Sequence, residues 1–276
     1  MKDRTKRIFR TSWLVIVVML GLTACYTVPE TGRKSVVAVS PAEETEMGKA
    51  AFAEVQAKEK VSTDPAANER VRRVGQRIAT AVGSALPSAQ WEFVVFDAPD
   101  TVNAFALPGG KVGVYTGLLK LAASDDELAI VMGHEIGHVT ARHGGERMTQ
   151  AYGVTALSAL AGIATQDNQY HDMVLQVFGA GGSLAVLAFS RSQESEADHI
   201  GIRYAAKAGY DPRAAITFWE KMAKQKGSAS TVKWLSTHPP DAQRISDLQR
   251  LMPEVIPLYD AARGVKPSGA EKPIGL

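Results

Sequence analysis

The sequence predicts an α+β fold that is mainly α-helical, with a small β-sheet directly before a central helix. Apolar residues at helical spacing recur along much of the 276-residue chain. Three short runs, residues 91–96, 102–107 and 111–115, are rich in valine and phenylalanine and are separated by turn residues, as is typical of strands. A capped helical segment beginning at Ser124 then carries an H-E-x-x-H motif.

The H-E-x-x-H motif consists of His134, Glu135 and His138. On a helix, residues i and i+4 are about 40° apart around the axis, so the two histidines share one face. Two imidazoles placed in this way can bind one Zn²⁺, and the glutamate between them can address a metal-bound water. A five-residue motif also arises by chance, so an ordinary helix with two histidines is the alternative.

A second cluster downstream supplies candidates for a third ligand. A catalytic zinc with two histidine ligands usually takes a carboxylate or a further histidine as its third protein ligand. Glu194 and Asp198 form an i,i+4 pair on a predicted helix, so both carboxylates can face the same site. One of them can bind the metal while the other accepts the free N–H of a ligand imidazole.

These two motifs together resemble those of the gluzincin metallopeptidases, the family of the CAAX prenyl endopeptidases and of bacterial HtpX, BepA and LoiP. Residues 102–110 and 236–240 resemble the same family, and the similarity extends over residues 42–251. It implies a zincin-like metallopeptidase domain with one Zn²⁺ per chain. Position by position, it implies zinc ligands at His134, His138 and Glu194, a catalytic base at Glu135, and an acid that orients a ligand histidine at Asp198.

The remaining acid and histidines near the motifs are interpreted as non-catalytic. Glu196 is expected to be solvated. His143 lies five residues after His138, with Ala141 at the third position. A metzincin needs glycine at the third and histidine at the sixth position, so that alternative fails, and His143 is expected to be structural. His171 is expected in a loop or at the surface, and His199 away from the metal face.

His238 is a further candidate catalytic residue. The two prolines that follow it exclude helix and stiffen the loop, which can therefore aim one imidazole. Two roles are open: stabilising the oxyanion of a tetrahedral intermediate, or occupying the fourth zinc position and keeping the enzyme latent. A turn histidine is the plainer alternative. Arg244 could serve the oxyanion or could be a surface arginine.

The first residues are typical of a lipoprotein signal peptide, predicted over residues 1–24. Five basic residues precede an apolar stretch, Trp13 to Leu22, that is too short to span a bilayer. The stretch ends in Leu22-Thr23-Ala24-Cys25, which resembles a bacterial lipobox and places the chain's one cysteine at the lipidation position. Tyr26 follows instead of an aspartate, which favours an outer-membrane lipoprotein that faces the periplasm.

Beyond the leader, the sequence predicts a lipidated tether (25–40), a metallopeptidase domain (41–252) and a flexible tail (253–276). Without the leader the chain has 26 basic and 28 acidic residues, so its charge offers no case for binding nucleic acid. Helices are expected at 41–60, 66–82, 124–143, 211–225 and 240–251. The glycine pair at 144–145 is the expected stop of the third of these helices.

Two segments have open structural roles. The small sheet can present an edge strand to an extended polypeptide, with Asn103, Ala104 and Phe105 as the candidate substrate strand, or it can simply support the core. Residues 155–189 are rich in small and apolar residues, and their last part, Met173–Phe189, is nearly apolar, so that a membrane span is an alternative. At 17 residues, with Gln176 and three glycines, it falls short of the required 20 or so. Helices packed against the active site, or a lid over it, are expected instead.

The sequence as a whole therefore predicts a zinc metalloendopeptidase with polypeptide substrates, attached to the membrane through the lipid on Cys25. The family resemblance implies misfolded or misassembled envelope proteins as substrates and a role in protein quality control. Two other functions are open: a chaperone-like zinc protein of the same fold with low activity, and an integral inner-membrane protease.

Overall fold

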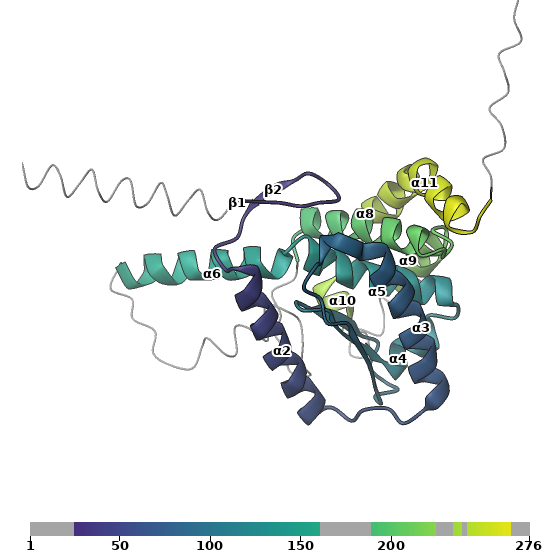
Figure 1. The fold of residues 1–276 in the computed structure, drawn as a ribbon, viewed down its shortest axis with the longest axis horizontal. Helices are drawn as coiled ribbons and strands as arrows, with labels where there is room; N and C mark the ends of the chain where they lie inside the picture. Colours follow the sequence, from purple (N-terminus) through teal and green to yellow (C-terminus); the bar gives the residue numbers. More distant parts are fainter. Residues whose placement is uncertain (1–24, 161–188, 225–233, 239–241, 266–276) are drawn as a thin grey trace, which may run out of the picture.

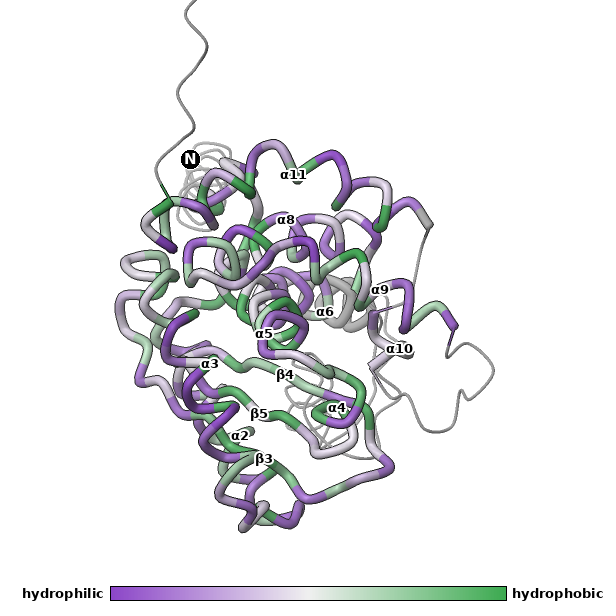
Figure 2. Tube along the Cα trace, turned by 90° about the vertical axis from the view of Figure 1, so that its right-hand side faces the viewer, coloured by the Kyte–Doolittle hydropathy of each residue, from purple (hydrophilic) through white to green (hydrophobic). Residues whose placement is uncertain are grey.

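The computed structural model describes residues 25–160, 189–224, 234–238 and 242–265. A three-stranded sheet, helix α5 (Asp125–Thr140), helix α8 (Arg191–Lys207) and helix α11 (Ala242–Ala262) are stacked one upon another (Figure 2). Helices α2 (Pro41–Lys58) and α3 (Pro65–Val82) run beside the sheet (Figure 1). The mainly helical α+β fold expected from the sequence is confirmed.

The sheet has the strand order β3-β5-β4, which leaves β4 at an edge. Strand β3 (Glu92–Phe96) pairs parallel with β5 (Lys111–Tyr115), and β4 (Ala104–Leu107) pairs antiparallel with β5. Gly109 and Gly110, in the β4–β5 turn, have φ angles of 86° and 82°, a backbone conformation that glycine adopts without strain. The three strands lie within one or two residues of the predicted runs.

The two faces of the sheet pack into different hydrophobic clusters, as period-2 alternation requires. One cluster surrounds α2 and is aromatic, with Phe52, Phe96, Phe105 and Tyr115 buried. The other joins the opposite face of the sheet to α3, α5 and α8. Helix α5 is therefore the core helix of the protein, and its residues from Glu127 to Thr140 are all buried.

Helix α5 begins as expected but ends earlier. The Ser124 hydroxyl accepts the N–H of Glu127, whose carboxylate reaches back to the N–H of Ala123. The expected stop at the glycine pair was wrong. The helix ends at Thr140, Arg142 adopts a left-handed φ of 56°, and the glycines lie inside helix α6 (His143–Leu160).

Both ends of the described chain are more ordered than expected. Residues 25–40 are no free tether. Strands β1 (Cys25–Thr27) and β2 (Lys34–Val36) form a hairpin, and Val28, Val37 and Val39 are buried. The tail expected from residue 253 is helical as far as Ala262. Prolines 253 and 257 lie inside α11, which continues because its apolar face, with Val255 fully buried, packs into the core.

The remaining described elements are short. They are the 3₁₀ helix η1 (Gly83–Ala85), α4 (Thr116–Leu121), α9 (Ala214–Lys224) and α10 (Trp234–Thr237). Within the described ranges, none of the helices combines the length and the apolar character needed to cross a bilayer. The leader lies outside these ranges, as does the span considered at Met173–Phe189, except for Phe189 itself.

Candidate metal centre and active site

Helices α5 and α8 cross at backbone contact, because small residues lie at the crossing. A Cβ built on Gly133 would lie 2.6 Å from the carbonyl oxygen of Gly201, and one on Gly201 would lie 2.5 Å from the main-chain nitrogen of His134. Gly137 meets Ala197 in the same way. Larger side chains would hold the helices apart. The close approach brings the first turn of α8, which carries Glu194, against the histidine face of α5.

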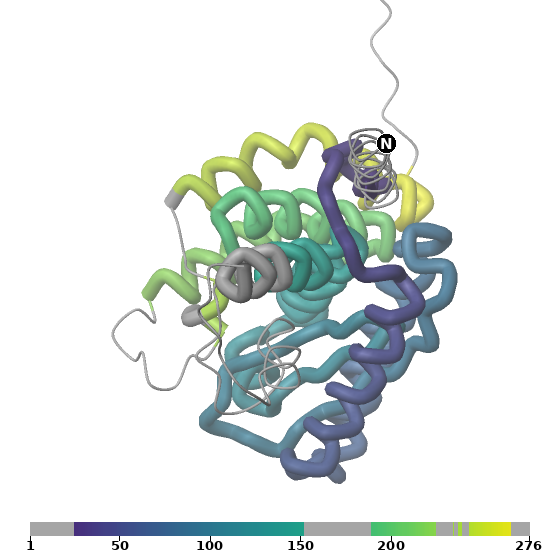
Figure 3. The backbone as a smooth tube through the Cα atoms, turned by 90° about the vertical axis from the view of Figure 1, so that its left-hand side faces the viewer, coloured from purple at the N-terminus to yellow at the C-terminus, as the bar shows by residue number. Residues whose placement is uncertain are grey.

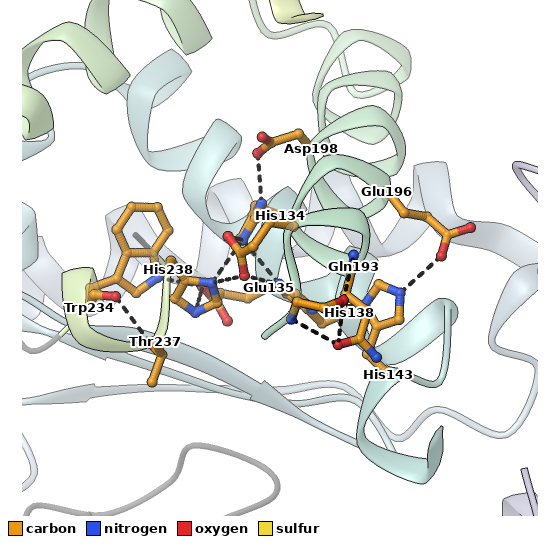
Figure 4. A network of polar contacts seen from close by, with 12 residues as sticks. His134, Glu135, His138, His143, Gln193, Glu196, Asp198, Trp234, Thr237 and His238 are labelled. Atoms are coloured by element: carbon orange, nitrogen blue, oxygen red, sulfur yellow. Dashed lines mark hydrogen bonds and ion pairs between the residues drawn. The ribbon is translucent and has the colours of Figure 1, made fainter. Parts of the chain in front are cut away.

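Four side chains that can bind a metal converge at this crossing: His134, His138, Glu194 and His238. The three histidines are labelled in Figure 4. One ligand atom from each lies within 4.8 Å of all the others, and all four residues are buried. The Nε2 atoms of His134 and His138 are 3.1 Å apart, and His134 Nε2 is 3.2 Å from His238 Nδ1. The Glu194 carboxylate lies 3.4 Å from His138 Nε2 and 2.8 Å from His238 Nδ1.

The donor set fits zinc. A tetrahedral zinc with N ligands at 2.0–2.1 Å places those nitrogens about 3.3 Å apart, close to the separations found here. Ring nitrogens that face one another at this distance need a proton or a cation between them. Three imidazoles and one carboxylate are ligands that zinc accepts readily. His238, which was expected near the site, lies within the cluster itself.

Asp198 lies behind His134, on the side away from the cluster. Its Oδ1 is 2.9 Å from His134 Nδ1, so it is placed to hold that ring with Nε2 toward the cluster. Arg244, on α11, donates to both Asp198 oxygens at 2.6 and 2.7 Å and is paired with Glu194 at 2.5 Å. It is 5% exposed. The interpretation of Arg244 as a surface residue was therefore wrong, and its guanidinium is paired with both carboxylates.

Glu135 contacts the α10 segment (Trp234–Thr237) and His238 directly after it. The indole N–H of Trp234 donates to Glu135 Oε1 at 2.6 Å, and His238 Nε2 lies 3.4 Å from the same oxygen. Trp234 is buried, and its main-chain N–H donates to the carbonyl of Val102, next to β4. Sequence reasoning missed Trp234. A single tryptophan belongs to no motif with a defined spacing. The one sign in the sequence is that Trp234 lies four residues before His238.

Glu196 is not solvated, contrary to expectation. It is 8% exposed, and its Oε2 lies 2.9 Å from Nε2 of His143, whose other ring nitrogen is 2.8 Å from His138 Nδ1. His143 is buried, and its place beside a motif histidine was not foreseen. Helix α5 ends at Thr140, and after the break at Arg142 His143 begins α6, so that His143 does not continue around the axis of α5. His199 lies away from the cluster, 4.0 Å from Glu254 on α11.

The charges in the centre are set by burial and by each other. Burial raises the pKa of Glu194, but the neighbouring histidines outweigh it and hold the pKa well below its ordinary value. Burial likewise raises the pKa of Asp198, and Arg244 and His134 reverse the shift. Burial lowers the pKa of His138 well below its ordinary value. An ionised carboxylate and an unprotonated imidazole are the forms that bind a metal.

Glu196 is also kept ionised. Burial raises its pKa, but hydrogen bonds from His143, Thr31 and Arg33 outweigh this and lower the pKa to about 2. The acid therefore lies in a polar network and not in water.

A pocket connects the centre to the edge strand. Asn103, Ala104 and Phe105 line it together with Glu135 and His138. The Tyr115 N–H donates to the carbonyl of Asn103, and in an antiparallel pair such bonded positions alternate. Asn103 and Phe105 are therefore engaged with β5, whereas the main-chain groups of Ala104 and Ala106 point away from it, to the side where the described residues form no further strand of this sheet. Both alanines are buried. Of the three residues of the candidate substrate strand, only Ala104 therefore turns its main-chain groups away from β5, and Ala106 is a further position of this kind.

An H-E-x-x-H helix whose histidines converge with a glutamate from a second helix defines a zinc metallopeptidase site on a zincin-like α+β fold. The comparison with known families agrees. Residues 65–252 match peptidase family M48, and the chain belongs to this family.

The relatives of the chain include proteins from mitochondria and from bacteria. "Mitochondrial metalloendopeptidase OMA1" of Arabidopsis thaliana is 40% identical over 184 residues, 66% of this chain and 36% of that protein. The Schizosaccharomyces pombe protein of the same name is 37% identical over 185 residues, 67% of this chain and 52% of its own. "Beta-barrel assembly-enhancing protease" of Escherichia coli is 29% identical over 238 residues, 84% of this chain and 48% of that protein. The chain thus spans about half or less of the length of these relatives.

Proposed function

We propose that the protein is a zinc-dependent metalloendopeptidase, anchored by a lipid in the bacterial envelope, that hydrolyses peptide bonds of misfolded or misassembled envelope proteins. The observation that carries the peptidase activity is the convergence of His134, His138 and Glu194 beside the carboxylate of Glu135, in a pocket that reaches a strand edge.

In this proposal His134, His138 and Glu194 hold one zinc ion. Bound zinc would polarise the scissile carbonyl and lower the pKa of a water molecule at the site. Glu135 takes the proton of that water as it attacks the carbonyl carbon, and then delivers the proton to the leaving amine. The hydrogen bond from Trp234 holds the Glu135 carboxylate in position, and Asp198 keeps His134 in the ligating orientation.

The substrate would bind as an extra strand along β4. The outward main-chain groups of Ala104 and Ala106 can pair with an extended polypeptide of any sequence. The carbonyl of Val102, on the same edge, is taken by Trp234. An added strand would therefore run beside the two alanines, with its scissile bond near Glu135. Such main-chain recognition suits a protease that acts on unfolded chains.

The envelope location is supported by the leader over residues 1–24, with its lipobox-like sequence before Cys25, and by the similarity to the bacterial protease whose name refers to β-barrel assembly. The mitochondrial relatives support the same chemistry in another compartment.

Cleavage of casein by the full chain in detergent, measured beside Glu135→Gln with the zinc content of both, tests the activity. We expect both proteins to hold about one zinc. The wild type should cleave, and the variant should be slower by about 10²–10⁴-fold, the usual contribution of a general base. A zinc-loaded wild type that cleaves neither casein nor other unfolded chains would indicate a latent or narrowly selective enzyme if His238→Ala cleaves, and would favour the chaperone-like alternative if that variant is inactive too. If neither protein binds zinc, the assignment is wrong.

A further inference from the structure

The ring nitrogen of His138 that faces away from the metal cluster has a buried partner of its own. His138 Nε2 faces His134 and Glu194 at 3.1 and 3.4 Å. Its Nδ1 lies 2.8 Å from Nδ1 of His143, a residue that is completely buried. His143 Nε2 in turn lies 2.9 Å from Oε2 of Glu196 (Figure 4). The three side chains thus form a line that leads away from the metal cluster.

One arrangement of protons satisfies this line when Nε2 of His138 binds a metal. Neutral His138 then carries its proton on Nδ1 and donates it. Nδ1 of His143 can accept only if it is unprotonated, so the proton of His143 is on Nε2 and is donated to Glu196. The hydrogen bonds therefore all run in one direction and end on a carboxylate.

The N-terminal hairpin holds the far end of the line. Arg33 Nε donates to Glu196 Oε2 at 2.6 Å, and the Thr31 hydroxyl donates to Oε1 at 2.5 Å. Arg33 also pairs with Glu146 on α6 at 2.6 Å. Figure 3 shows the hairpin segment passing over the helices before the chain enters α2. Residues close to Cys25 in sequence are therefore joined to the centre of the protein.

We propose that His143 and Glu196 are positioning residues for the metal centre, and that Arg33 of the hairpin acts through them to hold His138 in its ligating orientation. The arrangement matches the one on the other side of the cluster, where Asp198 and Arg244 support His134. This inference rests on one part of the proposed function, namely that His138 is a zinc ligand. It makes the hairpin that follows Cys25 part of the support of the metal site.

The test is the zinc affinity of the full chain in detergent, measured by competition with a chromophoric chelator after the metal has been removed. His143→Phe should weaken zinc binding by roughly 10- to 100-fold, the usual effect of losing such a partner. His143→Gln, which can accept from His138 and donate to Glu196, should recover part of the loss. Arg33→Gln should weaken binding less than His143→Phe does.

A double-mutant cycle separates the proposed line from general loss of structure. Arg33→Gln should add little when His143 is already phenylalanine, because its effect has to pass through that residue. Glu30→Gln is the matched control. It removes ion pairs between the hairpin and Arg203 and Lys207 on α8, without touching Glu196, and should leave the zinc affinity unchanged. Unfolding of the metal-free variants is followed in parallel.

Three results would overturn the proposal. They are unchanged zinc affinity in His143→Phe, full additivity of the His143 and Arg33 changes, and a loss in Glu30→Gln as large as that in Arg33→Gln. In each of these the wild type still binds zinc, and the proposed function stands. A wild type that binds no zinc would instead overturn the proposed function and this inference together.

Discussion

His238 lies across the metal cluster from α5, with its Nδ1 close to both Glu194 and His134. That nitrogen is therefore placed as a fourth ligand. The Glu135 carboxylate lies near the other ring nitrogen. A fourth protein ligand occupies the position that a catalytic zinc keeps open for water and substrate. Of the two roles open for His238 from the sequence, we propose the latent one on the basis of this placement.

His238→Ala is accordingly expected to increase the rate of casein cleavage, because it opens the fourth position. Initial rates of the zinc-loaded variant and the wild type, at equal zinc content, provide the measurement. A loss of roughly 10²-fold or more would show instead that His238 stabilises the oxyanion, and equal rates would exclude both roles.

Single residues also show the limit of local reasoning. Glu194 and Asp198 on α8 are partners of the motif histidines, and their shared face follows from i,i+4 spacing. Glu196 lies between these two acids in the sequence and on the same helix, yet its surroundings come from the hairpin and α6. Its environment could not be predicted from its neighbours in sequence, because residues 163 and 53 positions away supply the contacts.

At the scale of elements, the contact between α5 and α8 decides whether the ligands meet. Gly133, Gly137 and Gly201 allow the two backbones to touch. The spacing of the H-E-x-x-H motif does not predict this contact. The glycines inside both predicted helices are the one feature of the sequence that indicates close packing.

Gly201→Ala should therefore separate α5 from α8 and move Glu194 away from the histidines, because the added methyl group would meet the main-chain nitrogen of His134. We expect the free energy of unfolding to fall by about 1–3 kcal/mol, the usual cost of overpacking a core, and zinc binding to weaken. Calorimetry of the metal-free protein and zinc titration are the measurements. Ser195→Ala on the same helix is the control. Wild-type zinc affinity in Gly201→Ala would contradict the expectation.

Helix α5 is also braced at its first turn by α3. Arg70 and Arg73 on α3 bind the two oxygens of Asp125, at 2.9 and 2.7 Å. Burial raises the pKa of Asp125, but Arg73 and Arg70 outweigh this and lower it below the ordinary 3.8. Because the folded protein binds this proton less readily than the unfolded chain does, the stabilisation is present above pH 3.8 and is lost as the pH falls through the folded pKa.

Asp125→Asn should lower the free energy of unfolding at pH 7 by up to about 1 kcal/mol, since the pair is partly exposed. The difference from the wild type should shrink as the pH falls below about 4. Urea unfolding of the metal-free proteins between pH 7 and pH 3 measures it. Glu69→Gln, which removes the exposed ion pair with Arg72 inside α3, is the control and should have a smaller effect. A difference that grows on acidification would contradict the assignment.

At the scale of the whole molecule, the hairpin links the exposed Cys25 directly to the folded body. The predicted lipid would therefore be attached next to a packed segment. A lipid at that position would hold the domain close to the membrane surface.

Cys25→Ala, exported behind a cleavable leader, should remain in the soluble periplasmic fraction, whereas the wild type should be released from membranes only by detergent. Metabolic labelling with palmitate and cell fractionation measure the two properties. A Cys25→Ala protein that stays embedded in the membrane after its leader has been cleaved would support the integral inner-membrane protease instead.

The sequence by itself determined the features that depend on helical geometry and turn chemistry alone. The facing histidines of the H-E-x-x-H motif, the Glu194–Asp198 pair, the three strands and the start of α5 are of this kind. Each follows from residues within a few positions of one another, whose relative placement is the same in any helix or strand.

Only the tertiary structure decided which distant segments complete the site. The reversal at Arg142 brings His143 back against His138, the α10 segment sets Trp234 on Glu135, and α11 delivers Arg244 to the two carboxylates. The hairpin and the last turns of α11 are ordered because their apolar residues pack into the core. These contacts depend on how whole elements pack. The spacing of nearby residues does not encode which distant segments are buried against one another.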